Sequence, residues 1–112
     1  MSFNVPFVVV NGSSTYTMYN VTVYSQNNSS PATAQSLAPG QTIGPVGISQ
    51  NGNQDWFIQY TVNGACHIRD TKECGFDGND NGQIAMIILY PENFSVIPPQ
   101  SSNCINNRTD KC

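Results

Sequence analysis

The chain has 112 residues, of which 38% are hydrophobic and 10% are charged, and its formal net charge is −3. This length fits one domain with one hydrophobic core over residues 1–112, and eleven aromatic residues argue against disorder. The four Lys and Arg residues exclude the basic surface that nucleic acid requires, and no apolar run approaches the roughly 20 residues of a transmembrane helix. Polarity comes instead from 41 Asn, Gln, Ser and Thr residues.

The first part of the chain is predicted to form two β-strands. Residues 3–10 are rich in β-branched and aromatic side chains, and Pro6 within them predicts an edge strand. Residues 15–24 alternate strongly, which predicts one buried face and one amphipathic face. The predicted buried face consists of Tyr19, Val21 and Val23.

The next segment is less regular. Residues 31–38 are interpreted as a short helix or a surface loop, and a turn ends them. Residues 42–48 form a weak strand that Gly and Pro interrupt, and Asn51–Gly52 is a tight-turn dipeptide.

Strands are predicted again in the second half. Residues 55–62 alternate cleanly and end at the turn dipeptide Asn63–Gly64. Residues 83–90 are apolar on both faces, which predicts a central strand covered on both sides. Residues 93–97 are the last predicted strand.

These elements predict a mainly β fold, an antiparallel β-sandwich of six or seven strands with two disulfides. No segment of useful length shows a helical period. The alternative is a small α+β fold with helices within residues 30–38 and the cysteine-rich segments.

Four cysteines, Cys66, Cys74, Cys104 and Cys112, indicate two disulfides and an oxidising compartment, so a secreted, extracellular protein is expected. The N-terminus has no signal-peptide pattern, which with the cysteines suggests a mature secreted form. The two matched C-x7-C spacings favour local closure, 66–74 and 104–112, although a cross pairing would staple more chain.

The cysteine segments carry every basic residue of the chain: Arg69, Lys72, Arg108 and Lys111. They are interpreted as exposed loops. Such loops could form a charged contact surface for a protein partner, or charge could simply gather where the chain is most exposed.

The sequence contains N-x-[ST] sequons, whose candidate acceptors are Asn11, Asn20, Asn28, Asn93 and Asn107. Glycosylation in a secretory host and a simple crowding of short polar residues in turns are two readings of this pattern.

No enzymatic activity is predicted. His67 is the single histidine, no nucleophile-elbow motif accompanies it, and no thiol remains free if both disulfides form. Its neighbour Cys66 points to the opposite face of an extended chain, which disfavours a zinc site.

Residues 77–82 match the first half of a calcium-binding loop, but Ile88 stands where that loop needs a bidentate carboxylate. No metal or other cofactor is therefore predicted. A weak calcium site of another kind remains an alternative to a polar turn.

The same polar residues suit a neutral sugar, which planar amides and carboxylates recognise while an aromatic ring stacks on its apolar face. Trp56 shares a face with Ile58 and Tyr60 and is assigned to the core, so Phe57 and Tyr24 are the exposed ring candidates. The predicted ligand-binding residues are Tyr24, Asn53, Asp55, Phe57, Asp77, Asn79, Asp80 and Asn81.

The runs LAPGQT (residues 37–42) and DWFIQY (residues 55–60), in a small, β-rich, charge-poor chain with four cysteines in its second half, resemble the small secreted immunomodulatory and lectin-like proteins of mushrooms. The resemblance implies a secreted homodimer that binds glycans or cell-surface glycoproteins. The expected function is carbohydrate binding with defence or immunomodulatory activity. The alternative is a protein-binding or toxin-like effector that acts through its basic segments. Residues 3–10 are the expected dimer edge.

Overall fold

A computed structural model describes residues 3–26, 31–46, 49–50 and 53–112, with the backbone alone described at residues 3, 49–50 and 53–54. The predicted turn at Asn51–Gly52 and the sequon residue Asn28 lie outside the described residues. No helix within the described ranges is long and apolar enough to cross a membrane.

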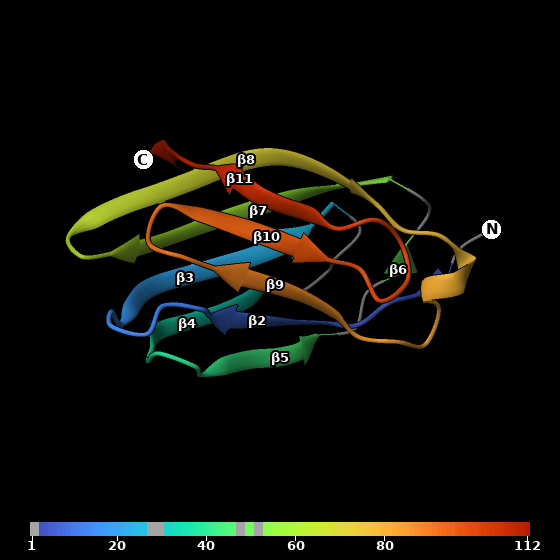
Figure 1. Ribbon diagram of the computed structural model, residues 1–112, viewed down its shortest axis with the longest axis horizontal. Helices are drawn as coiled ribbons and strands as arrows, with labels where there is room; N and C mark the ends of the chain where they lie inside the picture. The colour runs from blue at the N-terminus through green and yellow to red at the C-terminus, as the bar shows by residue number, and fades with distance from the viewer. Residues whose placement is uncertain (1–2, 27–30, 47–48, 51–52) are drawn as a thin grey trace.

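The chain folds as a β-sandwich whose strands run along its long axis (Figure 1). The main strands are β2 (Phe7–Asn11), β3 (Met18–Ser25), β4 (Ala32–Leu37), β5 (Thr42–Val46), β7 (Asn53–Val62), β8 (Ala65–Gly75), β9 (Ala85–Leu89), β10 (Asn93–Ile97), β11 (Cys104–Arg108) and β12 (Asp110–Lys111). One sheet has the order β11-β10-β9-β2-β5, and the other has the order β12-β8-β7-β3-β4. Two short strands, β1 (Phe3–Asn4) and β6 (Ser49–Gln50), pair with each other.

The core forms where the alternating apolar residues of both sheets meet. Trp56 of β7 lies edge-on against Phe7 of β2, with ring centroids 5.0 Å apart and an interplanar angle of 86°. Four alternate residues of β7 are fully or almost fully buried: Trp56, Ile58, Tyr60 and Val62. The predicted register of this strand and the assignment of Trp56 to the core are confirmed.

The predicted β-sandwich is confirmed, and the α+β alternative is wrong. The described residues contain one helix, the three-residue 3-10 turn η1 (Gly78–Asp80). The chain nevertheless divides into more strands than the six or seven predicted. The sheets are also not wholly antiparallel, because β2 and β9 pair in parallel.

The N-terminal strand is not an edge strand, which corrects the prediction for residues 3–10. Pro6 falls in the break between β1 and β2, where its missing N–H removes no ladder hydrogen bond. Its carbonyl accepts a 2.8 Å bond from the Ala85 N–H. Because β2 pairs with β5 on one side and β9 on the other, its backbone is not available for a dimer.

A bulge changes the predicted faces of β3. The register against β7 shifts between Tyr19 and Thr22, and Asn20 has a φ of 52°. This bulge reverses the side-chain alternation below it, so Met18 is fully buried and Tyr19 is 50% exposed. Tyr19 therefore leaves the predicted buried face, whereas Val21 and Val23 remain in it.

The segment interpreted as a short helix or a surface loop is strand β4. It pairs along β3, with Ala34 opposite Val21 and Thr33 opposite Thr22. β3 gains a second hydrogen-bonded neighbour in this way, and this tertiary pairing outweighs the weak β-propensity of alanine.

The two disulfides join Cys66 to Cys112 and Cys74 to Cys104, so the favoured local closure is wrong. β8 is extended, and eight residues at about 3.3 Å each separate its two cysteines by about 26 Å. A disulfide allows at most about 7 Å between Cα atoms. The observed Cα–Cα distances are 5.4 Å and 6.2 Å.

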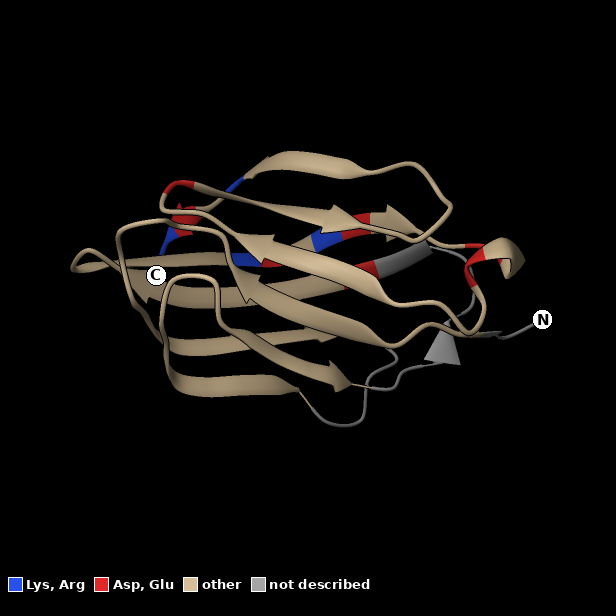
Figure 2. Cartoon of the chain, turned by 60° about the horizontal axis from the view of Figure 1, so that its bottom comes forward, with Lys and Arg blue, Asp and Glu red and all other residues tan. Residues whose placement is uncertain are grey.

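The charged segments are strands rather than loops. β12 pairs with β8 at the edge of its sheet, and the Cys74–Cys104 disulfide joins β8 to β11 of the other sheet. Figure 2 shows the charged residues along these strands and at η1, whereas most other strands carry none. Residues 1–64 contain a single charge, Asp55.

Peptide mapping tests this disulfide pairing. Trypsin cuts after each of the four basic residues, so the unreduced fragment that ends at Arg69 should stay joined to Cys112. Fragment 73–108 should stay closed on itself, and Asp-specific cleavage at Asp77 and Asp80 should release only the short peptide between the two cuts while the flanking pieces stay joined. Mass spectrometry that finds fragment 1–69 joined to fragment 73–108 would contradict the pairing.

Candidate functional site

Two aromatic rings stack on the outward side of the sheet that contains β3 and β7. Tyr24 and Phe57 are opposite each other in the strand register, and both are half-buried. Their ring centroids are 4.9 Å apart with an interplanar angle of 14°. Each ring covers one face of the other, and both rings remain partly exposed to solvent. These are the two residues predicted as exposed rings.

Polar side chains surround this pair, and we call the whole surface the aromatic face: Tyr24, Phe57, Asp55, Thr22 and Gln59. Thr22 and Gln59 form the next outward-facing cross-strand pair, and Asp55 is exposed at the start of β7. Gln26 fixes this end of the face, since its Oε1 accepts a 2.9 Å bond from the Asp55 N–H. The face thus combines two rings with amide, hydroxyl and carboxylate groups.

The turn over residues 77–81, predicted to bind a ligand, is held together by its own side chains. The Asp77 carboxylate caps η1 by accepting a 2.8 Å bond from the Asn79 N–H. The Asn81 Oδ1 accepts a 3.0 Å bond from the Asn4 N–H and thereby ties the turn to β1. Both groups act as internal acceptors.

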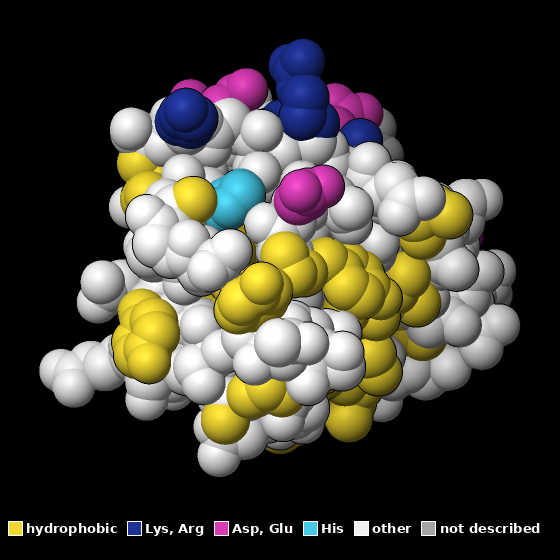
Figure 3. All heavy atoms as spheres, turned by 60° about the vertical axis from the view of Figure 1, so that its left-hand side comes forward, with side chains coloured by type: hydrophobic (Ala, Val, Ile, Leu, Met, Phe, Trp, Pro, Cys, Tyr) yellow, Lys and Arg dark blue, Asp and Glu magenta, His cyan; other side chains and the backbone are white. Residues whose placement is uncertain are grey.

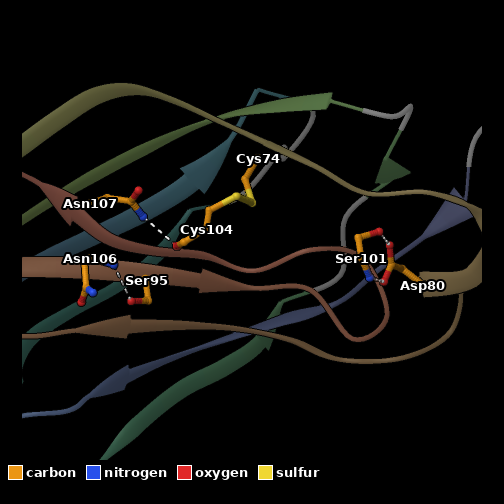
Figure 4. Close-up of a disulfide and its surroundings, with 7 residues drawn as sticks. All are labelled: Cys74, Asp80, Ser95, Ser101, Cys104, Asn106 and Asn107. Atoms are coloured by element: carbon orange, nitrogen blue, oxygen red, sulfur yellow. Dashed lines mark hydrogen bonds between the residues drawn. A yellow bond between two sulfur atoms is a disulfide. The ribbon is translucent and has the colours of Figure 1, made fainter.

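Asp80 lies inside the protein rather than on its surface. Its side chain is fully buried, and its carboxylate accepts bonds from the N–H groups of Asp77, Gln100 and Ser101 at 2.9, 2.7 and 3.0 Å. The Ser101 hydroxyl donates a fourth bond (Figure 4). Burial raises the pKa of Asp80, but these hydrogen bonds outweigh it and leave the pKa below its usual value. Asp80 therefore fastens the turn to residues 100–101.

The two groups of predicted ligand residues are near the same end of the molecule. Asn53 is paired with Gly75, which precedes the turn by two residues, although the Asn53 side chain is outside the described residues. Among the described side chains, no hydrogen bond joins the turn to the aromatic face. The described part of the chain also has no group of three His, Cys, Asp or Glu side chains placed to hold a metal.

The outward side of the other sheet contains a groove that was not predicted. Its volume is about 610 Å³, and its lining combines apolar residues with Ser95, Asn93 and Glu92. The apolar lining consists of Ile88, Tyr90, Pro91, Ile97 and Ile105. A side chain at Gly12 would have its Cβ 2.6 Å from the Ile88 Cγ2 and 2.8 Å from the Tyr90 Cε1, so only glycine lets these two lie there.

β9 is central in its sheet, as predicted, but it is not covered on both sides. Ala85, Ile87 and Leu89 are fully buried in the core, whereas Met86 is 40% exposed. The outward groove begins on this strand. The two-faced apolar pattern of residues 83–90 was the sequence signal for this surface.

Tyr60 connects the core to the rim of the groove. Its hydroxyl lies 2.8 Å from the Tyr90 carbonyl and 3.1 Å from the Asn93 carbonyl, so its one proton is shared between them. Burial raises the pKa of Tyr60, which keeps the hydroxyl protonated as a donor. On the other side, His67 stacks on the Tyr60 ring and contacts the Thr109 hydroxyl through Nδ1.

The four basic residues come together at one edge of the sandwich but mix with acidic residues. The Arg69 Nη1 donates a 3.0 Å bond to the Arg108 carbonyl, which joins the two cysteine segments. Asp70 and Glu73 of β8 and Asp110 of β12 lie among the basic residues. The edge therefore has no strong field of one sign, which weakens its case as a charge-selective surface.

The sequon residues differ in access. Asn11 is 1% exposed, and its Nδ2 donates 2.8 Å bonds to the Tyr16 and Leu37 carbonyls. The Nδ2 of Asn107 likewise bonds the Cys104 carbonyl. A glycan replaces one of the two N–H hydrogens, so it would remove one of the two bonds of Asn11, whereas the single bond of Asn107 needs only the hydrogen that is left; glycosylation at these positions stays a prediction. Asn20 is exposed and Asn93 is half-buried.

Comparison with known proteins finds no match to any protein-family model or to any curated protein.

Replacing Asp80 by Asn should destabilise the fold in a pH-dependent way. The amide puts an NH2 group among N–H donors, which costs about 1–3 kcal/mol at neutral pH. Because the folded pKa of Asp80 is lowered, its stabilisation is present above the unfolded pKa of about 3.9 and is lost as the pH falls through the folded pKa.

Urea denaturation of the parent and Asp80→Asn between neutral and acidic pH measures this difference. The gap between them should narrow in acid. Asp77→Asn is the matched control, since Asn also caps helices and should change stability by less than about 0.5 kcal/mol. A gap that stays constant with pH would contradict the role of Asp80.

Proposed function

We propose that the protein is a secreted carbohydrate-binding protein with defence or immunomodulatory activity, and that it binds neutral glycans at the aromatic face. One observation carries the proposal, the outward stack of Tyr24 on Phe57 beside Asp55, Thr22 and Gln59. The apolar face of a pyranose packs on an exposed aromatic face, and its hydroxyl groups bond planar carboxylates and amides.

The charge distribution agrees with a neutral ligand. Asp55 is the one charged residue in the first 64 positions, and β3 contains none. Anionic ligands such as phosphates need cationic or N–H-rich sites, and the basic residues of this chain lie on β8, β11 and β12. Two disulfides in a 12.2 kDa chain support secretion, because disulfides persist in oxidising compartments.

The turn over residues 77–81, which was predicted to bind the ligand, is not part of the proposed binding site. The Asp80 carboxylate already accepts four hydrogen bonds, so we leave it out of the ligand set. Tyr24, Phe57 and Asp55 form the binding residues of the proposal.

A glycan array with the oxidised protein tests the proposal. A defined set of neutral glycans should bind, and Phe57→Leu or Tyr24→Leu should weaken the binding by about five- to tenfold. Leucine retains apolar volume but removes a ring whose stacking contributes about 1–1.5 kcal/mol. The fluorescence of the buried Trp56 reports that each variant is folded.

Two controls separate this face from the rest of the surface. Tyr16→Leu removes a 38% exposed tyrosine outside the aromatic face and should leave binding intact. Charge reversal at Arg69 and Arg108 should also leave it intact; if it alone abolishes binding, the basic edge is the site. A blank array with folded protein would refute the proposal.

A further inference from the structure

The outward side of the sheet that contains β9 presents aliphatic residues to solvent from four adjacent strands. We call this surface the aliphatic face: Val8 and Val10 of β2, Met86 and Ile88 of β9, Ile97 of β10 and Ile105 of β11. Ile105 is 57% exposed and Met86 is 40% exposed. The outward residues of a solvated sheet are normally polar, so the apolar composition of this surface is typical of a protein–protein interface.

The aliphatic face carries almost no charge. β2, β9 and β10 contain no charged residue, and Glu92 is the one charged residue in the groove lining. Figure 3, which brings the left-hand end of Figure 1 forward, shows hydrophobic side chains grouped in the middle and at the right, and the basic side chains along the upper edge. Arg108 of β11 lies opposite Asn93 at one end of the groove, but it is paired with Asp110, so little net charge remains there to attract an anionic partner or an acidic membrane surface.

The shape of the aliphatic face is suited to packing against the same face of a second copy. Ile105, which is 57% exposed, forms one wall of the groove that Ile88, Tyr90 and Ile97 also line, so the face has an exposed edge beside a hollow. In a dimer with a two-fold axis, the exposed edge of each copy meets the hollow of the other, so the same contact forms twice.

We propose that the aliphatic face is the contact between two copies of this chain, packed sheet to sheet about a two-fold axis. The chain is 42 Å long and 23 Å wide, an area on the order of 1000 Å² as an upper limit, and a standard interface takes about 800 Å² from each partner. With the strands of the two copies antiparallel, the two Glu92 side chains lie at opposite ends of the contact and do not repel. This dimer replaces the one expected through residues 3–10.

The inference is independent of the proposed carbohydrate site, which lies on the outward side of the other sheet. Pairing through the aliphatic face leaves both aromatic faces free and pointing away from each other. A dimer would therefore persist even if the protein bound no glycan.

Light scattering after size exclusion tests the contact. The parent should have twice the 12.2 kDa mass of the chain at concentrations of about 100 µM, far above the dissociation constant of a micromolar dimer. The double variant Met86→Lys and Ile105→Lys should be monomeric under the same conditions, with a dissociation constant at least about 100-fold higher, because it buries four unpaired charges in the dimer.

Tyr19→Lys is the matched control. It places a charge at a residue of similar exposure on β3, outside the aliphatic face, and it should remain dimeric. Circular dichroism establishes that each variant is folded. A monomeric parent overturns the proposal, as does a dimer that survives both lysines or one that Tyr19→Lys disrupts.

Discussion

The strict alternation of side chains along β7 constrains the rest of the molecule. Trp56, Ile58 and Tyr60 are fully buried between the sheets, so the residues between them must face outward. A slip of one residue would move Trp56 to solvent and Phe57 into the core. The contact of Trp56 with Phe7 excludes that slip and holds the two sheets in one alignment. The stacking of Phe57 on Tyr24 follows from this register.

The two disulfides constrain the other side of the sandwich in a similar way. β8 and β11 belong to different sheets, and the Cys74–Cys104 bond joins them where no backbone ladder does. Cys112 is bonded to Cys66, which holds β12 on the edge of β8. Asp80 adds a polar fastening at the far end through residues 100–101. These links position β10 and β11, and with them the groove.

The sequence predicted those features that depend on local pattern. The alternation over residues 55–62 and the Asn63–Gly64 turn are found as expected, and both turn residues have positive φ. Features that depend on residues distant in the sequence could not be predicted from it. The C-x7-C spacing suggested local pairing, whereas an extended β8 separates Cys66 from Cys74. The bulge at Asn20, which exposes Tyr19, and the burial of Asp80 also depend on partners distant in sequence.

The candidate site shows the same limit. Tyr24, Phe57 and Asp55 could be named because strand alternation placed them outward. The aliphatic face could not be predicted in the same way, because the pattern of residues 83–90 indicated a strand covered on both sides but did not indicate what covers it. If the aromatic face binds a ligand and the aliphatic face a second copy, as proposed, the dimer presents two binding sites on opposite sides.

An NMR titration of the uniformly ¹⁵N-labelled, oxidised protein with a neutral glycan that it binds tests the central claim most directly. Amide shifts should concentrate at Tyr24, Asp55 and Phe57, while the amide signals of Met86, Ile88 and Ile105 should not shift. Shifts centred on the groove, on η1 or on the β8–β12 edge would contradict it.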